Sequence, residues 1–260
     1  MSEQDPNATL VERRDVTESL AYFLVAPDKA PFASFEPGQF TNLGLEVFDR
    51  TVGERRFVRR AYSMGSPPTQ RARLEFYVRR VQGGLLTEAL FELRSGARLW
   101  LDAAVYGRFT LEPVPADRDV VFVASGTGVA PYVSMLRAYS GRRRWRRAVL
   151  VETVREEREL GYRAEIEAFA THDPSFVWLP TVTRAPETSP WRGARVRVPT
   201  LLDPEAFARR TGVALDPSTT HVLLCGNPTM LADVSTRLGE LGFVPHSRRA
   251  PGQVHTERYW

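Results

Sequence analysis

The chain has 260 residues, of which 43% are hydrophobic and 25% are charged, a composition typical of globular proteins. The formal net charge is only +4, although 35 residues are Lys or Arg and Lys29 is the only lysine among them. Cys225 is the only cysteine, which excludes an internal disulfide, a cysteine-rich zinc module and a four-cysteine iron–sulfur cluster in this chain. We expect two domains of moderate size.

Two features of the sequence bear on location and partners. No apolar run reaches the roughly 18 residues that would span a membrane, and residues 1–7 lack the basic and apolar segments of a signal peptide. We therefore expect a cytoplasmic protein. The arginine-rich run 142–147 lies between a predicted helix and a predicted strand, so we expect a solvated turn and no binding of nucleic acid. An arginine-rich face also suits an acidic protein partner.

The first part of the chain reads as short strands separated by turns. The predicted strands are 10–14, 20–26, 39–45, 57–64, 74–81 and 98–105, with one predicted helix over 85–93. Many short strands at regular spacing indicate an antiparallel β-barrel or sandwich. We assign this first domain to residues 1–115.

From Asp119 onward the pattern changes to strands that alternate with helices. The predicted pairs are 120–124 with 131–140, 148–152 with 160–171, 176–182 with 199–211, and 221–225 with 228–241. This alternation predicts an α/β domain with a doubly wound parallel sheet over residues 116–260. The boundary falls in the proline-rich stretch 112–117.

A cation, an aromatic ring and a hydroxyl occur together at the end of the predicted strand 57–64. Arg60 and Tyr62 lie on one face of this strand about 7 Å apart, and Ala61 and Ser63 lie on the other. The first pair suits a phosphorylated aromatic cofactor. The alternative is a surface arginine beside a half-buried strand tyrosine.

A glycine pair opens the predicted helix that follows residues 74–81. Gly83 and Gly84 leave backbone N–H groups accessible, and Thr87 adds a hydroxyl. Because a helix N-terminus attracts anions, this turn is a candidate for a second contact with the same diphosphate. The alternative is a capped helix with no ligand.

A second glycine-rich turn follows the apolar strand 120–124. Gly126 and Gly128 allow a tight turn that approaches a dinucleotide, and Pro131 suits the first turn of the next helix. The pattern differs from the commoner G-x-G-x-x-G by its final proline. A generic tight turn is the alternative.

The end of the strand 221–225 repeats this arrangement. Gly226 and Asn227 follow the strand, and Pro228 stands at the start of the next helix. Ligands of doubly wound sheets bind at the carboxyl ends of the strands, where both turns lie. Cys225 is either a buried core thiol or an uncharged wall against a nicotinamide ring.

These motifs, in this order, resemble the ferredoxin–NADP reductase superfamily, and residues 9–260 resemble its bacterial ferredoxin/flavodoxin–NADP reductases. The matching segments are 37–40, 60–63, 84–87, 126–131, 225–228 and 257–260. The resemblance implies an N-terminal FAD-binding antiparallel barrel and a C-terminal NADP-binding α/β domain. It also implies electron exchange with an acidic ferredoxin or flavodoxin.

The resemblance further implies roles for individual residues. Arg60 and Thr87 would contact the FAD diphosphate, Tyr62 would cover one flavin face, and Ser63 would approach flavin N5. Tyr259 would cover the other face, and Trp260 would pack on the adenine. The complete set expected at FAD is Arg60, Ala61, Tyr62, Ser63, Tyr77, Gly84, Leu85, Leu86, Thr87, Thr127, Tyr259 and Trp260.

On the NADP side the resemblance places Arg155 and Arg184 at the 2'-phosphate. A third arginine, Arg197, fits the pattern best, with Arg192 and Arg195 as alternatives. The complete set expected at NADP is Gly126, Gly128, Arg155, Thr183, Arg184, Arg197, Gly226, Asn227 and Pro228. The set expected to take part in catalysis is Tyr62, Ser63, Cys225, Glu257 and Tyr259, and Arg248 and Arg249 are expected to meet the protein partner.

The expected reaction is hydride transfer between nicotinamide C4 and flavin N5, followed by transfer of single electrons to the partner. No metal is expected, because the four histidines show no ligand spacing. Two alternatives remain. One is the reductase component of an oxygenase, and the other is a non-catalytic flavin- or dinucleotide-binding regulatory module, which the presence of both sets of phosphate-binding turns disfavours.

Overall fold

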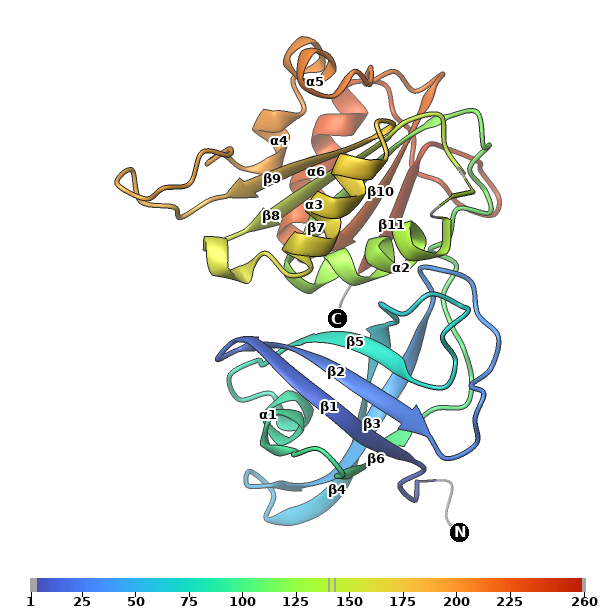
Figure 1. The fold of residues 1–260 in the computed structure, drawn as a ribbon, viewed down its shortest axis with the longest axis vertical. Coiled ribbons are helices and arrows are strands. Elements are labelled where there is room, and N and C mark those ends of the chain that lie inside the picture. The colour runs from blue at the N-terminus through green and yellow to red at the C-terminus, as the bar shows by residue number, and fades with distance from the viewer. Residues whose placement is uncertain (1–3, 140, 143, 259–260) are drawn as a thin grey trace. The chain divides into compact units, whose positions relative to one another are not determined.

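The computed structural model describes residues 4–139, 141–142 and 144–258, which form two compact units (Figure 1). The first unit comprises Met1–Thr110 and Ala130–Ala138, and the second comprises Leu111–Val129 and Tyr139–Trp260. The units divide after Thr110, a few residues before the boundary expected from the sequence. Residues Ala130–Ala138, which the sequence assigned to the second domain, belong to the first unit.

The first unit is built on a six-stranded antiparallel sheet. Its strands are β1 Ala8–Thr17, β2 Leu20–Pro27, β3 Phe40–Asp49, β4 Glu54–Ser63, β5 Leu74–Arg79 and β6 Arg98–Leu101, in the order β4-β3-β6-β1-β2-β5. An antiparallel bridge between Met64 and Phe76 brings the edge strands β4 and β5 together, so the sheet curls into a barrel. The helix α1, Leu85–Glu92, contacts β3 and β4. The predicted antiparallel barrel is confirmed.

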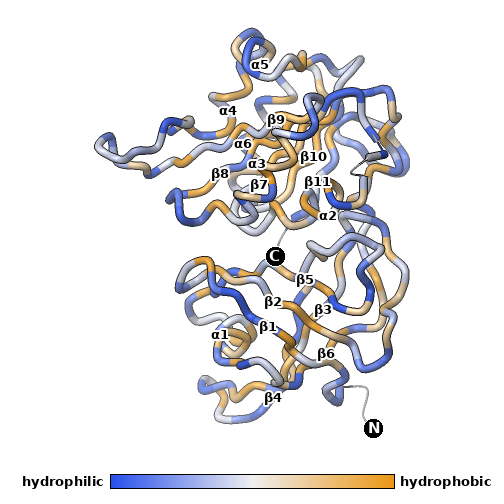
Figure 2. Tube along the Cα trace, viewed as in Figure 1, coloured by the Kyte–Doolittle hydropathy of each residue, from blue (hydrophilic) through white to orange (hydrophobic). Residues whose placement is uncertain are grey.

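The interior of this barrel is apolar because alternate strand residues point inward. On β2, Phe23 and Val25 are fully buried, and on β5 the same holds for Leu74 and Phe76. Figure 2 shows hydrophobic residues along the strands of both units and hydrophilic residues in many of the connecting loops.

The second unit is built on a five-stranded parallel sheet. Its strands are β7 Asp119–Ser125, β8 Ala148–Val154, β9 Phe176–Val182, β10 Thr220–Gly226 and β11 Val254–Arg258, in the order β11-β10-β7-β8-β9. The central strand β7 contains a run of apolar residues, 120–124, that are all fully buried, as expected for a strand covered on both faces.

Helices cover the two faces of this sheet. On one face, α4 (Val198–Leu201), α5 (Pro204–Thr211) and α6 (Pro228–Glu240) share one apolar cluster with alternate residues of β7, β8 and β10. The helix α3 (Arg163–His172) contacts β9, and Figure 1 shows it in front of the sheet with α6 behind. The doubly wound parallel sheet is therefore confirmed. The helix α2, Ala130–Tyr139, follows the short turn η1, Gly126–Val129, and is the helix counted mainly with the first unit.

The bounds of several strands differ from the prediction, as in β6, which ends at Leu101 and not at residue 105. Three further differences concern whole elements or their starts. The helix expected from residue 160 begins at Arg163, because Tyr162 adopts a left-handed conformation with φ of 59°. The helix expected over 199–211 is two helices, since the Asp203 side chain caps a new one by accepting from Ala206 N at 2.9 Å. Strand β11 was not predicted. Its residues contain only one apolar side chain, Val254, so no alternating pattern marks it.

The arginine-rich run contains a residue that anchors it to the second unit. Trp145 is buried, and its ring packs edge-on against Phe122 with centroids 6.0 Å apart. Arg146 binds the buried Asp119 carboxylate through two hydrogen bonds of 2.8 and 2.6 Å. Arg144 donates to the Leu111 carbonyl at 2.9 Å. Within the described part of the chain, no helix combines the length and the hydrophobicity that a membrane crossing requires.

Candidate functional site

The tetrapeptide predicted to bind the flavin ends strand β4. Tyr62 is partly buried against the barrel core and Ser63 is buried, whereas Arg60 and Ala61 are exposed. Burial raises the pKa of the Tyr62 phenol, and the positive charge of Arg60 opposes this shift only in part. The Tyr62 ring is therefore neutral at physiological pH, which suits stacking against an uncharged aromatic surface.

The predicted diphosphate turn forms the N-terminus of α1. Gly84 is the N-cap residue, and the Thr87 hydroxyl accepts from Val81 N at 3.0 Å. The first N–H groups of a helix have no partner within the helix, so those of Leu85, Leu86 and Thr87 are donors for an anion. Because α1 contacts β4, the unit brings together the two elements that carry Arg60 and Thr87.

Tyr77, which the resemblance placed at FAD, packs against another strand of the barrel. It is buried on β5, and its ring stacks on Tyr22 with centroids 4.8 Å apart. This pairing is a cross-strand contact between β2 and β5.

An ion-pair network centred on the buried Glu75 holds the backbone that follows Ser63. The Glu75 carboxylate accepts from Arg137 at 2.7 Å and from Arg14 at 3.0 Å. Arg137 also donates to the Gly65 carbonyl at 2.9 Å, and Ser66 Oγ accepts from Glu75 N at 2.6 Å. Sequence reasoning missed these positioning residues, since a lone acid in an apolar strand was the only signal.

In the second unit the two glycine turns pack against each other. A side chain on Gly128 would lie 2.4 Å from the Cys225 carbonyl oxygen, and one on Gly226 would lie 2.2 Å from Ser125 Oγ. The same Ser125 Oγ accepts from Asn227 N at 2.7 Å. Gly128 was predicted to approach a dinucleotide. The structure adds that it must also approach this chain's own backbone.

These turns lead into the helices α2 and α6. Thr127, in η1, is partly exposed. The Asn227 side chain caps α6 by accepting from Thr229 N at 2.9 Å, and Pro228 occupies the first helical turn. Cys225 is fully buried and is the register partner of the partly buried Glu257 on β11.

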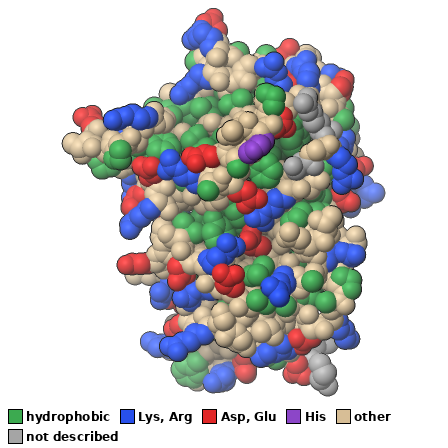
Figure 3. Space-filling model, in the orientation of Figure 1, with side chains coloured by type: hydrophobic (Ala, Val, Ile, Leu, Met, Phe, Trp, Pro, Cys, Tyr) green, Lys and Arg blue, Asp and Glu red, His purple; other side chains and the backbone are tan. Residues whose placement is uncertain are grey.

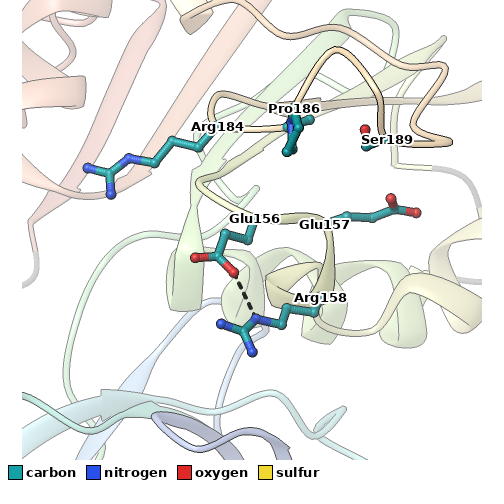
Figure 4. Close-up of a pocket in the computed structure, with 7 residues that line it drawn as sticks. Glu156, Glu157, Arg158, Arg184, Pro186 and Ser189 are labelled. Atoms are coloured by element: carbon teal, nitrogen blue, oxygen red, sulfur yellow. Dashed lines mark hydrogen bonds and ion pairs between the residues drawn. The ribbon is translucent and has the colours of Figure 1, made fainter.

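A cavity of about 440 Å³ opens in the second unit beyond the ends of β8 and β9 (Figure 4). It is lined by Glu156, Glu157, Arg158, Arg184, Ala185, Pro186 and Ser189. Arg184 N donates to the Arg155 carbonyl at 2.9 Å, and Thr183 N donates to the Val154 carbonyl at 3.0 Å. The structure therefore brings together the segments of Arg155, Thr183 and Arg184, although the side chain of Arg155 does not line the cavity.

Glu159 fixes the turn after β8 and was not predicted. It is buried, and its Oε2 atom accepts from Arg155 N at 3.0 Å and from Glu156 N at 3.1 Å. A glutamate three residues after a helix-start position is the signal that could have identified it.

The three arginines considered as a third phosphate contact differ in their surroundings. Arg195 donates to the Trp191 carbonyl at 2.7 Å and is partly buried within its own loop. Arg197 is 80% exposed, with Asp233 at 3.9 Å, and Arg192 is exposed. Arg197 and Arg192 are thus accessible to a ligand, whereas Arg195 serves the loop.

Three of the four histidines form a cluster that their spacing in the sequence did not indicate. His221 Nδ1 lies 3.1 Å from His255 Nε2, and the His246 ring centroid lies 4.4 Å from that of His255. Burial, with smaller effects from His246 and His221, lowers the pKa of His255 to about 3. Within the described residues, no group of three or more His, Cys, Asp or Glu side chains is arranged to hold a metal ion.

Glu152 on β8 is another buried titratable residue that the sequence did not single out. It is fully buried, and its Oε2 atom accepts from Trp178 Nε1 at 3.0 Å, while Oε1 has no hydrogen-bond partner among the described residues. Burial raises the pKa of Glu152 to about 8, and the bond from Trp178 opposes this shift. The carboxyl group is therefore mainly protonated at pH 7.

The residues expected to meet partner or cofactor at the end of the chain are only partly described. Arg248 and Arg249 are exposed. Tyr259 and Trp260 lie outside the described residues. Figure 3 shows Lys and Arg side chains interspersed with Asp and Glu over the face that it draws, with no single large basic patch there.

Two family models match the chain, one in each half. An oxidoreductase FAD-binding domain matches residues 7–110, and an oxidoreductase NAD-binding domain matches residues 122–236. The chain is therefore an oxidoreductase with an FAD-binding barrel and an NAD-binding α/β domain.

Relatives that match most of the chain show to which family of these oxidoreductases it belongs. The chain is 31% identical over 232 residues to a flavodoxin/ferredoxin–NADP reductase of Buchnera aphidicola subsp. Baizongia pistaciae (strain Bp), covering 89% of this chain and 90% of that one. It is 33% identical over 233 residues to that of Escherichia coli (strain K12), with 89% and 90% covered. The chain belongs to the flavodoxin/ferredoxin–NADP reductase family.

A solved structure agrees with this assignment. A ferredoxin NADP+ reductase from Neisseria gonorrhoeae, with bound FAD and NADP, matches 98% of this chain and 98% of its own length, with a TM-score of 0.85 and 28% identity.

Proposed function

We propose that this protein transfers electrons between NADP(H) and an acidic flavodoxin or ferredoxin, with non-covalently bound FAD between them. The observation that carries the proposal is the pair of interlocked glycine turns at the ends of β7 and β10, in a chain whose other unit is an FAD-binding barrel. The names of relatives at 31% and 33% identity support the same reaction.

The residues of the first unit fit FAD better than FMN. Arg60 offers an exposed guanidinium, and the N-terminus of α1 offers backbone N–H groups and the Thr87 hydroxyl. All of these are donors, as a diphosphate requires, and FMN has no diphosphate. Tyr62 covers one face of the ring system, and Ser63 lies at the end of the same strand to donate a hydrogen bond. Bound FAD supplies the chemistry that accepts a hydride and releases single electrons.

The second unit fits a phosphorylated nicotinamide dinucleotide. The turns at Gly126 and Gly226 lie at the carboxyl ends of parallel strands, where such ligands bind. Arg155, Arg184 and Arg197 are exposed and bind the 2'-phosphate that distinguishes NADPH from NADH. Cys225 is fully buried, as the core-thiol alternative predicts, and its register partner Glu257 compensates charge close to the ligand.

The protein partner is acidic and docks through Arg248 and Arg249, which are exposed on the connection before β11. Attraction between exposed charges is screened within about 8 Å at physiological salt. The docking step is therefore the salt-sensitive part of the reaction, and a cytoplasmic location fits such partners.

The proposal is tested on the purified protein. Flavin released by acid is expected to be FAD, at about one per chain, and NADPH is expected to reduce an artificial acceptor faster than NADH does. Reduction of an added flavodoxin is expected to slow as salt rises, whereas reduction of a small neutral acceptor stays constant. Recovery of FMN alone, or of no flavin, contradicts the cofactor assignment, and a flat salt response with flavodoxin contradicts the docking assignment.

A further inference from the structure

The cavity of the second unit contains an ion pair that the proposed function does not use. Glu156 Oε2 accepts from Arg158 Nε at 2.8 Å, and both residues line the cavity together with Arg184. The charged lining residues are two glutamates and two arginines, so their formal charges cancel. A cavity at the expected place of a phosphate thus carries its own competing carboxylate.

The two glutamates of the lining are not equivalent. Glu157 Oε1 accepts from Arg163 Nη1 at 2.7 Å, and Arg163 extends from α3 outside the cavity lining. Figure 4 shows the Glu157 side chain extending in the opposite direction from those of Glu156 and Arg184. The charge of Glu157 is therefore compensated by an arginine outside the lining. Glu156 is the acid that pairs with an arginine of the lining, Arg158.

The Glu156–Arg158 pair is accessible and weak. The side chain of Arg158 is 71% exposed and that of Glu156 is 50% exposed, so water screens their attraction. A phosphate monoester carries a charge of about −1.5 to −2 near neutral pH, more than one carboxylate carries. Arg158 can therefore exchange Glu156 for a phosphate at little cost.

We propose that Arg158 is a further ligand of the 2'-phosphate of NADP(H) and that Glu156 competes with the nucleotide for it. This inference rests on the proposed NADP(H) function. When the nucleotide leaves, Glu156 takes back Arg158, which favours release. Glu156 thereby sets the affinity for the phosphorylated nucleotide without touching NADH use.

The test is calorimetric binding of 2',5'-ADP and of 5'-AMP to the flavin-loaded protein. Glu156→Gln is expected to tighten 2',5'-ADP binding about threefold to fivefold, because it removes both the competitor and a like charge, and to leave 5'-AMP unchanged. Arg158→Ala is expected to weaken 2',5'-ADP about fivefold or more. Glu157→Gln removes the same charge one residue away, and about a twofold change or less is expected.

The double variant decides the role of Arg158. If Arg158 contacts the phosphate, Arg158→Ala weakens 2',5'-ADP binding in the Glu156→Gln background as well. If that substitution has no effect there, Arg158 only neutralises Glu156, and the inference is overturned. It is also overturned if Glu156→Gln binds 2',5'-ADP as the wild type does. A wild type that binds both ligands equally overturns the NADP(H) function itself, which separates the two failures.

Discussion

Cys225 on β10 and Glu257 on β11 are register partners in the parallel sheet. Side chains directly opposite each other on neighbouring strands point to the same face, and such strands lie about 4.8 Å apart. The chain's single cysteine and a carboxylate are thus adjacent at the carboxyl end of the sheet. The two residues come from separate motifs, and only the formation of β11 brings them together.

If the Glu257 carboxylate compensates charge near the flavin, as proposed above, Glu257→Gln is expected to slow reduction of the flavin by NADPH about tenfold. Stopped-flow absorbance of the flavin measures this rate, with a smaller expected change in the NADPH dissociation constant. Glu240→Gln, on the exposed end of α6, is the control. An unchanged rate in Glu257→Gln would remove this residue from the catalytic set.

Arg184 and Arg195 are expected to respond differently to alanine. Arg184 lines the cavity, so Arg184→Ala raises the KM for NADPH about tenfold and hardly changes NADH use. Arg195 donates to Trp191 O within its loop, so Arg195→Ala lowers thermal stability and affects both nucleotides alike. Steady-state kinetics and thermal unfolding of the two variants provide the comparison. Equal losses with NADPH and NADH in Arg184→Ala would make that residue structural.

Stability is expected to fall in acid because of His255. Its folded-state pKa of about 3 lies below the ordinary value of 6.5, so the unfolded chain binds more protons between these values. The stabilisation is complete above pH 6.5 and is lost as pH falls toward 3. This loss gives the free energy of unfolding a pH dependence of at most about 1.4 kcal/mol per pH unit. Urea unfolding of His255→Gln at several pH values is expected to lack this dependence. His172→Gln, at an exposed position on α3, keeps it.

Glu152 is expected to give stability the opposite dependence on pH. Its folded-state pKa of about 8 lies above the ordinary value of 4.5, so its contribution falls as pH rises from 4.5 to 8. Glu152→Gln is expected to abolish this fall and to stabilise the protein increasingly toward pH 8. Between pH 4.5 and 6.5 the slopes of His255 and Glu152 offset each other in the wild type. Either substitution alone should therefore expose the slope of the other, and a wild-type-like pH profile in both variants would contradict the two assignments.

The sequence predicted the elements whose pattern is local. The buried run of β7 and the proline at the start of α6 are each specified by a few consecutive residues, and both formed where expected. The alternating strands of the barrel were likewise recognisable. What could not be predicted depends on pairing between distant segments. The histidine cluster needs β10, β11 and the loop between them, and the Glu75–Arg137 ion pair joins β5 to α2.

The contact of Gly128 with Cys225 is another feature that the sequence alone does not predict. Its spacing from Gly126 predicted a turn near a ligand, but no local pattern shows that its missing side chain makes room for the Cys225 carbonyl. Arg195 and Arg197 are likewise similar in sequence context. Only the folded loop shows that Arg195 donates a hydrogen bond to the Trp191 carbonyl.

The contact of Gly128 and Gly226 with the neighbouring turn has an energetic consequence. Each turn uses the other as its wall, and the bond from Asn227 N to Ser125 Oγ ties them together. Neither turn can move without displacing the other, so the proposed dinucleotide site has two edges whose separation is already fixed before binding. Little ordering entropy then remains to be lost on binding. A single alanine at either glycine would therefore disturb both turns at once.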